Sequence, residues 1–288
     1  MPYAAGGTTD AVARRLAPAL SQRVSQPVMV DNRPGAGGLA AAGAVARAAP
    51  DGHTLLAVDS NMFFIDDQAG TMGRREALEA LDLLGVVAET PLIIAASPNQ
   101  PIRSARDLVE TLKQGNARLN ISGGGTGLQS PAYRCYTLLQ RMINARADYV
   151  PYRTAAAALQ DTLAGSVHIF VGSLAIADEA IRTGRLMPLA RLSSAVAPGF
   201  EALPTLDQFI PGFRFSVWTG IMSPRGAPQA IRDMLSSDII AAAQAPAFRE
   251  QIGSIGLVPL ALGRSEAMQL VRLEIDLWLD RWCCRGGG

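Results

Sequence analysis

Apolar residues recur along this chain with two alternating periods, one typical of helices and one typical of strands. From Val12 to Val24 every fourth position is apolar, and Arg14 and Arg23 lie away from that stripe, which predicts an amphipathic helix. Short apolar runs such as 53–58 and 167–171 are bounded by glycine or polar residues and are typical of buried strands. Strands separated by single helices predict parallel sheets, and therefore an α/β fold.

The same reading predicts the remaining elements. Helices are expected at 38–48, 104–114, 131–143, 154–164, 175–183, 228–244, around Phe248 and at 265–282; strands are expected at 27–31, 53–58, 91–96, 118–121, 148–150, 167–171, 186–192, 214–222 and 257–262. Between Ala197 and Phe213 the periodicity stops and three prolines appear, which marks a connecting segment. We therefore expect one domain from 1–93 with 214–288, and a second from 94–213 inserted into it.

Composition excludes several classes of protein and of site. A hydrophobic content of 49% over 288 residues supports two cores, while a net charge of +1 and an aromatic content of 6% argue against a nucleic-acid partner. The apolar runs are shorter than the roughly 20 residues that span a bilayer. Cys135, Cys283 and Cys284 have neither zinc-site nor disulfide-framework spacing, so no metal is expected, and the role of the last two is left open.

A glycine-rich turn precedes the first amphipathic helix. Gly6 and Gly7 can turn backbone N–H groups inward, and a helix N-terminus behind them adds partial positive charge. The segment Ala5, Gly6, Gly7, Thr8, Thr9 and Asp10 is therefore a candidate anion site. The alternative is turn and cap chemistry, with Thr8 or Thr9 as the cap and Asp10 in the first turn.

Two further loops follow predicted strands and are rich in small or polar residues that could bind a ligand. Small residues and two hydroxyls in the loop after Ile121 would let a ligand approach backbone donors; they are Ser122, Gly123, Gly124, Gly125, Thr126 and Gly127. The turn Asp59-Ser60-Asn61 closes another strand. A flexible connector and an ordinary polar turn are the respective alternatives.

A rival signal is the run Gly35–Ala40, which fits G-x-G-x-x-A with its glycines in Gly35–Gly38 and is followed some two dozen residues later by Asp59. This approaches a dinucleotide fingerprint and predicts, as the alternative function, an NAD(P)-dependent oxidoreductase. Three residues separate the preceding strand from Gly35, however, whereas the fingerprint needs the strand to run into the turn. Hydrolase motifs are absent, and His53 and His168 are expected to be structural.

Five segments together resemble the Bug family, the periplasmic solute-binding receptors of tripartite tricarboxylate transporters. They are Pro2–Asp10, Asp31–Gly38, Ala49–Leu56, Val150–Arg153 and Leu203–Leu206. The resemblance implies a two-lobed periplasmic-binding-protein fold (Venus flytrap, type II-like) with mixed, mostly parallel sheets and a ligand cleft between the lobes. It also implies a non-enzymatic monomer without a cofactor, whose partners are a small organic acid and membrane subunits of the transporter.

The resemblance assigns roles to the loops. Ala5–Asp10 becomes the carboxylate loop of the first lobe with Ser60 and Asn61 beside it, Ser122–Gly127 becomes the facing loop, and Tyr152 lies near the cleft. Gly172 and Ser173 stand where relatives commonly carry an acidic residue, so a mono- or dicarboxylate or an aromatic acid is expected rather than an amino acid. Relatives also begin with a signal peptide and a first strand, and we expect both to be missing from this sequence.

Overall fold

The structure is a computed structural model that describes residues 1–35, 38–63, 76, 78–115, 119–125 and 130–279. The chain separates into two compact units, one formed by Met1–Glu89 with Trp218–Gly288 and the other by Thr90–Val217. The chain therefore crosses from one unit to the other twice, after Glu89 and after Val217. Among the described helices, none has both the length and the apolar character needed to span a membrane.

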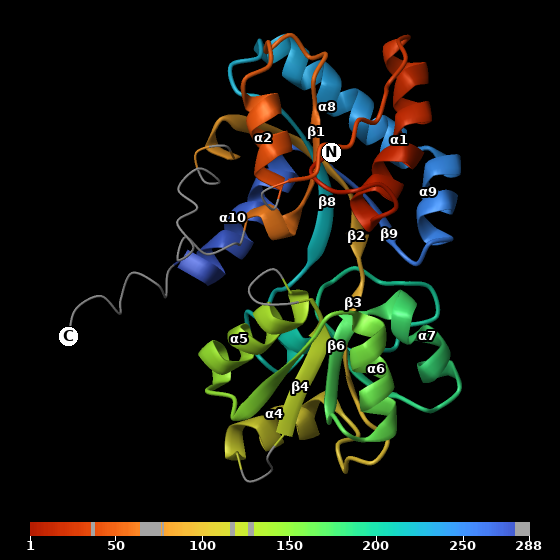
Figure 1. Cartoon of the computed structure of the whole chain (residues 1–288), viewed down its shortest axis with the longest axis vertical. Coiled ribbons are helices and arrows are strands. Elements are labelled where there is room, and N and C mark those ends of the chain that lie inside the picture. Colours follow the sequence, from red (N-terminus) through yellow and green to blue (C-terminus); the bar gives the residue numbers. More distant parts are fainter. Residues whose placement is uncertain (36–37, 64–75, 77, 116–118, 126–129, 280–288) are drawn as a thin grey trace, which may run out of the picture. The chain divides into compact units, whose positions relative to one another are not determined.

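The first unit is built on a four-stranded sheet. Its strand order is β1 (Leu56–Asp59), β8 (Val217–Pro224), β2 (Leu81–Thr90) and β9 (Val258–Gly263), and the pairs β1–β8 and β2–β9 are antiparallel. Its helices are α1 (Thr8–Val24), α2 (Leu39–Ala46), α8 (Gln229–Gln244), α9 (Pro246–Gly253) and α10 (Arg264–Leu279) (Figure 1).

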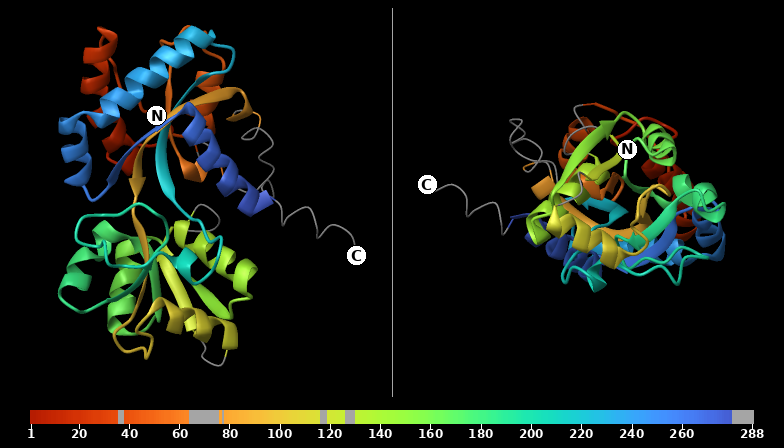
Figure 2. Two further views of the ribbon diagram at one scale, coloured as in Figure 1. Left: turned by 180° about the vertical axis from the view of Figure 1, so that it is seen from behind. Right: turned by 90° about the horizontal axis from the view of Figure 1, so that it is seen from below.

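Helices cover both faces of this sheet because successive strand residues point to opposite sides. Leu56 and Val58 of β1 pack in a core cluster that includes α2 and α10, whereas Ala57 packs in the cluster that includes α1, α8 and α9. The stripe predicted on the first helix is confirmed, since Val12, Leu16 and Leu20 are buried. Figures 1 and 2 show α1, α8 and α9 grouped on one side of the strands and α2 and α10 on the other.

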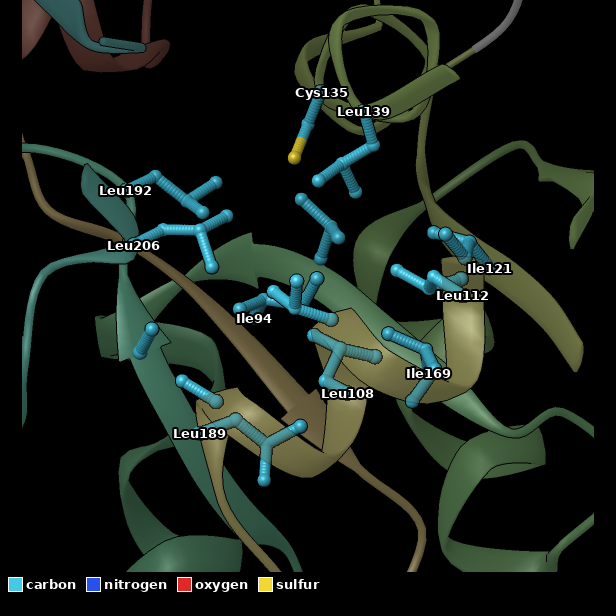
Figure 3. Close-up of a cluster of buried hydrophobic side chains, with 14 of the residues drawn as sticks. Ile94, Leu108, Leu112, Ile121, Cys135, Leu139, Ile169, Leu189, Leu192 and Leu206 are labelled. Carbon is cyan, nitrogen blue, oxygen red and sulfur yellow. The ribbon is translucent and has the colours of Figure 1, made fainter. Parts of the chain in front are cut away.

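The second unit has a five-stranded sheet. Its strand order is β5 (Ala147–Tyr152), β4 (Leu119–Gly124), β6 (Ile169–Ser173), β3 (Leu92–Ala96) and β7 (Met187–Arg191). Helices α4 (Ala105–Gln114) and α5 (Pro131–Ile143) share the large core cluster of Figure 3, where Leu108 of α4 and Cys135 and Leu139 of α5 surround Ile94 and Ile169. Helices α6 (Ala155–Ala164) and α7 (Leu174–Arg182) also contact β6.

Several predictions about the strands need correction. Parallel pairing holds for β4 with β5 and with β6, but β3 runs antiparallel to β6 and β7, and the pairs β1–β8 and β2–β9 of the first unit's sheet are antiparallel as well. The second unit's sheet is mixed, as predicted, but its antiparallel pairs are as numerous as its parallel pairs. A helix between two strands predicts parallel pairing only when it returns the chain to the edge of the sheet from which the first strand started. No such helix precedes β3, because the chain enters it directly from β2 at the first crossing.

Two further differences concern 27–31 and 81–90. No strand forms at 27–31. Among the described residues the backbone of this segment pairs with no backbone but that of Met1, whose amino group donates to the carbonyl of Asp31 at 2.9 Å, while the nearby Arg33 amide donates to the Met1 carbonyl at 2.8 Å. Conversely, β2 was not predicted, since its residues are buried on both faces and its sequence lacks the alternation of a half-buried strand.

Candidate functional site

The glycine-rich turn before α1 leaves donors at the start of that helix without an acceptor from the described residues. Gly7 is the N-cap and provides no side chain, so the prediction that Thr8 or Thr9 caps the helix was wrong. Gly6 has φ +91°, a left-handed conformation that glycine adopts without strain, and the residues from Ala5 to Thr8 are exposed. Within the described residues, the amides of Thr8 and Thr9 have no hydrogen-bond acceptor. Such amides at a helix N-terminus suit an anion.

Asp10 holds this turn in place. Its carboxylate accepts hydrogen bonds from the Gly6 amide at 3.0 Å, from Nε of Arg14 at 2.9 Å and from Nδ2 of Asn32 at 2.9 Å. The Arg14 hydrogen bond is the largest cause that lowers the pKa of Asp10 to about 2, with the Gly6 and Asn32 bonds acting in the same direction and burial opposing them. Asp10 is buried, so it positions the loop and its carboxylate is engaged within the protein.

The Asp59-Ser60-Asn61 turn joins the same loop. The Thr9 hydroxyl donates to Oδ2 of Asp59 at 3.4 Å, and Oδ1 of Asp59 accepts from the Asn61 amide at 2.9 Å. Ser60 is buried and its Oγ accepts from the Trp218 amide at 3.4 Å, so this hydroxyl faces inward. The structure therefore brings Thr9 and the 59–61 turn together, as the family resemblance implied, and leaves Asn61 partly exposed.

In the second unit, the predicted glycine loop is largely strand. β4 extends to Gly124, so Ser122, Gly123 and Gly124 lie within it. A Cβ on Gly123 would lie 2.2 Å from Cβ of Ala132, and one on Gly124 would lie 2.3 Å from the Ala155 amide nitrogen. These glycines allow α5 and α6 to approach the sheet. Gly125, with φ +95°, follows the strand, while Thr126 and Gly127 lie outside the described residues.

Two predicted side chains of this unit are engaged internally. Ser122 is buried and donates to the carbonyl of Ile169 at 3.3 Å. The Tyr152 hydroxyl donates to Oδ2 of Asp161 at 2.5 Å, near the C-terminal end of α6 and hence away from that helix's N-terminus. Burial and the Asp161 carboxylate raise the pKa of Tyr152 to about 12. This hydroxyl ties β5 to α6.

Ser173 stands at the N-terminus of α7. The parallel strands β4, β5 and β6 end at one edge of the sheet, where the helices that follow them begin. Side chains of Ser130 and Thr154 cap α5 and α6, but Ser173, the N-cap of α7, makes no capping bond. No described residue is recorded as a hydrogen-bond partner of its hydroxyl. Gly172 beside it is buried in β6. Ser173 is therefore an available donor at this edge.

Sequence reasoning missed the residues that brace the first loop. Arg14 lies four residues after Asp10, a spacing typical of helical ion pairs, so its role had a sequence signal. Asn32 had none, because it lies 22 residues from Asp10 in the chain. The amide of Asn32 also donates to the carbonyl of Tyr3 at 3.0 Å, and its Oδ1 accepts from Arg14.

The dinucleotide alternative lacks its structural context. Among the described residues no strand leads into Gly35, and the Gly38 amide bonds to the Gly35 carbonyl at 2.9 Å. The Asp59 carboxylate, which would bind a ribose, already accepts from Thr9 and Asn61. A Cβ on Gly38 would lie 3.1 Å from Cβ of Pro2, so its glycine serves local packing.

His168 has a structural role, and the described residues form no metal-binding cluster. Nδ1 of His168 accepts from the Asn120 amide at 3.1 Å while Oδ1 of Asn120 accepts from the His168 amide at 2.8 Å, which confirms the predicted structural role of His168. In the part of the chain that the structure describes, no group of three His, Cys, Asp or Glu residues is placed to hold a metal. A groove of about 470 Å³ lies along α8, next to Arg264, and none of the predicted site residues lines it.

Comparisons with known proteins identify the family. The sequence model of the tripartite tricarboxylate transporter family receptors matches residues 12–279. BugT of Bordetella pertussis is 30% identical over 280 residues, which cover 96% of this chain and 85% of that protein. A protein from the tcbD–tcbE intergenic region of Pseudomonas sp. strain P51 is 28% identical, with 96% of this chain and 82% of that protein covered.

Solved structures have the same fold. A TctC solute-binding protein from Polaromonas has a TM-score of 0.85 at 22% identity, covering 96% of this chain and 94% of its own. An R. palustris protein solved with adipate has a TM-score of 0.71 at 26% identity (97% and 93% covered), and MatC of Rhodopseudomonas palustris, solved with malate, 0.68 at 27% (97% and 96%). These likenesses confirm the predicted α/β solute-binding-protein fold. The chain is a member of the tripartite tricarboxylate transporter receptor family.

Proposed function

We propose that this chain is a periplasmic solute-binding receptor, without catalytic activity, that captures a small carboxylate and delivers it to membrane subunits of a tripartite tricarboxylate transporter. The observation that carries this proposal is the uncapped N-terminus of α1, where the Thr8 and Thr9 amides follow an exposed turn braced by Asp10. Related structures solved with adipate and with malate support the ligand class.

One donor group in each unit would bind the acid. In the first unit these are the amides of Gly7, Thr8 and Thr9 with the Thr8 hydroxyl and Asn61; in the second they are Ser173, the Gly125 backbone and, by the resemblance, Thr126 and Gly127. A hydrogen bond to a charged group contributes about 1.5 to 3 kcal/mol, so several would supply the roughly 8 kcal/mol of a micromolar complex. A cleft between the units that closes about the two crossings belongs to this proposal, as does action as a monomer without a cofactor.

The ligand class follows from the charges at these donors. Gly172 and Ser173 provide no carboxylate for a ligand ammonium group, and Asp10 is engaged with Arg14 and Asn32. The site therefore favours a plain mono- or dicarboxylate or an aromatic acid over an amino acid. Neutral donors also bind such an acid without leaving a buried unpaired charge when the site is empty.

Calorimetry and thermal-shift measurements with adipate, malate, benzoate, glutamate, NAD and NADP test the proposal. We expect at least one of the first three to stabilise the protein, and the nucleotides and glutamate to leave it unchanged. Stabilisation by a nucleotide alone would instead favour the dinucleotide alternative.

A substitution series at Thr8 tests the backbone donor. Thr8 is the first helical residue, where proline is tolerated, and Gly7 has extended angles compatible with a following proline. Thr8→Pro removes one N–H and the hydroxyl, Thr8→Ala removes the hydroxyl only, and Thr8→Ser is the control. We expect affinity to fall at least tenfold in Thr8→Pro and less in Thr8→Ala, with melting temperatures close to the parent. Equal affinities in all three variants would exclude this turn as the carboxylate site.

Ser173 offers the corresponding test in the second unit. We expect Ser173→Ala to weaken carboxylate binding about tenfold, because one hydroxyl donor to a charged group is lost. Ser254→Ala, which removes an exposed hydroxyl bonded to the Gln251 carbonyl, is the matched control and should bind normally. Unchanged affinity in Ser173→Ala would remove α7 from the site.

A further inference from the structure

Trp218 is the first residue of the first unit after the second crossing, and three separate contacts hold it there. Its amide donates to Oγ of Ser60 at 3.4 Å, its indole Nε1 donates to Oε2 of Glu274 at 3.1 Å, and its ring lies 5.3 Å from the ring of Phe63. Trp218 is fully buried and Glu274 of α10 is buried as well. One side chain thus joins β8, α10 and the segment that follows β1.

The strand register explains how Ser60 reaches Trp218. The antiparallel ladder of β1 and β8 pairs Val58 with Gly220 and ends with Asp59 opposite Thr219. At the next position Ser60 meets Trp218 through its side chain. The residue after the crossing is therefore tied to the Asp59–Asn61 turn, which is part of the candidate carboxylate site.

Gly220 allows the indole to lie against the sheet. Trp218 and Gly220 are two residues apart in β8 and so share one face. A Cβ on Gly220 would lie 3.1 Å from Cζ3 of the Trp218 ring. The indole therefore has a defined position, with its ring against Gly220 and its N–H bonded to Glu274.

The Trp218–Glu274 pair is unusual for a core contact. Apolar packing of similar volume commonly stabilises a protein as much as a buried charged group does, so a buried carboxylate facing an indole N–H is better explained by a requirement for one orientation than by stability alone. We infer that Trp218 is a positioning residue that links the 59–61 turn and α10 to the second crossing, so that carboxylate binding at this turn changes the surroundings of the indole. This inference rests on the proposed function.

Tryptophan fluorescence tests this inference, because the emission of Trp218 should not change on carboxylate binding if the residue only stabilises the fold. The chain has three tryptophans, and the double variant Trp278→Phe/Trp282→Phe leaves Trp218 as the sole indole emitter. With adipate and malate as probes, we expect a saturable change in Trp218 emission whose midpoint matches the calorimetric dissociation constant. Glutamate, which the site should reject, serves as the negative control.

Variants of Glu274 then test the link itself. Glu274→Ala removes the acceptor and should lower carboxylate affinity at least tenfold and abolish the emission change. Glu274→Gln keeps an acceptor oxygen and should restore both to within threefold of the parent. Asp82→Ala, which breaks the ion pair with Arg232 elsewhere in the first unit, controls for loss of stability and should leave affinity unchanged. If Glu274→Ala does not fold, Trp218→Phe removes the indole N–H, and its affinity is measured by calorimetry.

The outcomes separate this inference from the proposed function. If the parent chain binds none of the carboxylates, the proposed function fails and this inference fails with it. If the parent binds adipate or malate but Trp218 emission does not change and the alanine or phenylalanine variant binds normally, only the inference is overturned.

Discussion

The side-chain amide of Asn32 donates a 2.9 Å hydrogen bond to Oδ1 of Asp10, which lies 22 residues earlier in the chain. The same amide group bonds to the carbonyl of Tyr3, and Oδ2 of Asp10 accepts from the amide of Gly6. Asn32 therefore braces the glycine-rich turn from both ends. Because the turn is exposed and its two consecutive glycines can adopt many backbone conformations, its donors need such a brace to converge on a ligand.

Asn32→Ala should therefore weaken both stability and ligand binding. Loss of the two hydrogen bonds donated by this amide is expected to cost about 1 to 2 kcal/mol of unfolding free energy, and to lower carboxylate affinity several-fold because the turn loses its brace. Urea denaturation and calorimetry measure the two effects. Asp31→Ala is the matched control: its exposed pair with Arg33 should contribute less than about 0.5 kcal/mol. Equal losses in the two variants would contradict the bracing role.

The pH dependence of stability tests the Asp10 contacts. The pKa of Asp10 is lowered to about 2 in the folded protein from an ordinary value of 3.8, so the unfolded state binds more protons between these limits. The stabilisation is thus complete above about pH 4 and is lost as pH falls toward 2. We expect it to be about 1 to 2 kcal/mol, because Arg14 is half exposed and its charge is screened.

Denaturation of the parent chain and of Asp10→Asn from pH 6 to pH 2 measures how much the Asp10 carboxylate contributes to the free energy of unfolding. The difference in unfolding free energy between them should be constant near neutrality and shrink below pH 4. Asp51→Asn is the control, since the carboxylate there makes a local bond to the exposed His53 amide. A difference that persists unchanged to pH 2 would show that the Asp10 charge does not stabilise the turn.

Local sequence signals predicted the helices well. Helix α5 occupies 131–143 as predicted, because Ser130 caps it, Pro131 opens it and its apolar stripe faces the core. The capping pattern of Ser104 and Asp107 likewise places the start of α4. Strand partners and direction are not encoded locally, so the antiparallel course of β3 and the bracing of Asp10 by Asn32 could not be derived from spacing.

The glycine run at the end of β4 shows why part of the site could not be predicted. In the sequence, Gly123 and Gly124 are compatible with two structures. One is a loop that approaches a ligand, and the other is a strand against which helices pack closely. Only the positions of Ala132 in α5 and Ala155 in α6 distinguish the two readings. Ser173 was identified through the family resemblance, whereas its uncapped place at the start of α7 emerged from the structure.

Gly123→Ala should therefore destabilise the second unit strongly. The added methyl would lie 2.2 Å from Cβ of Ala132 and 2.3 Å from the Val171 carbonyl oxygen, so α5 or β6 has to shift. Overpacking of this kind costs about 1 to 3 kcal/mol, and contact with backbone places this position at the upper end. Gly253→Ala in α9 is the control, because nothing lies within 4 Å of its added methyl and alanine favours a helix. A melting temperature for Gly123→Ala equal to the parent's would contradict this packing.

A Tyr152 variant tests whether this hydroxyl stabilises the second unit, as its hydrogen bond indicates, or contacts the ligand, as the family resemblance implies. Its hydroxyl donates to Asp161 near the end of α6, so we expect Tyr152→Phe to lower the unfolding free energy by about 1 kcal/mol while changing adipate affinity less than twofold. The folded pKa of about 12 lies above the ordinary value of 10, so this stabilisation is complete below pH 10 and is lost as pH rises toward 12. Denaturation of parent and variant at pH 7, 10 and 11 should show the gap between them narrowing. A tenfold loss of affinity at unchanged stability would instead place the hydroxyl on the ligand, because an internal tie between β5 and α6 cannot produce that combination.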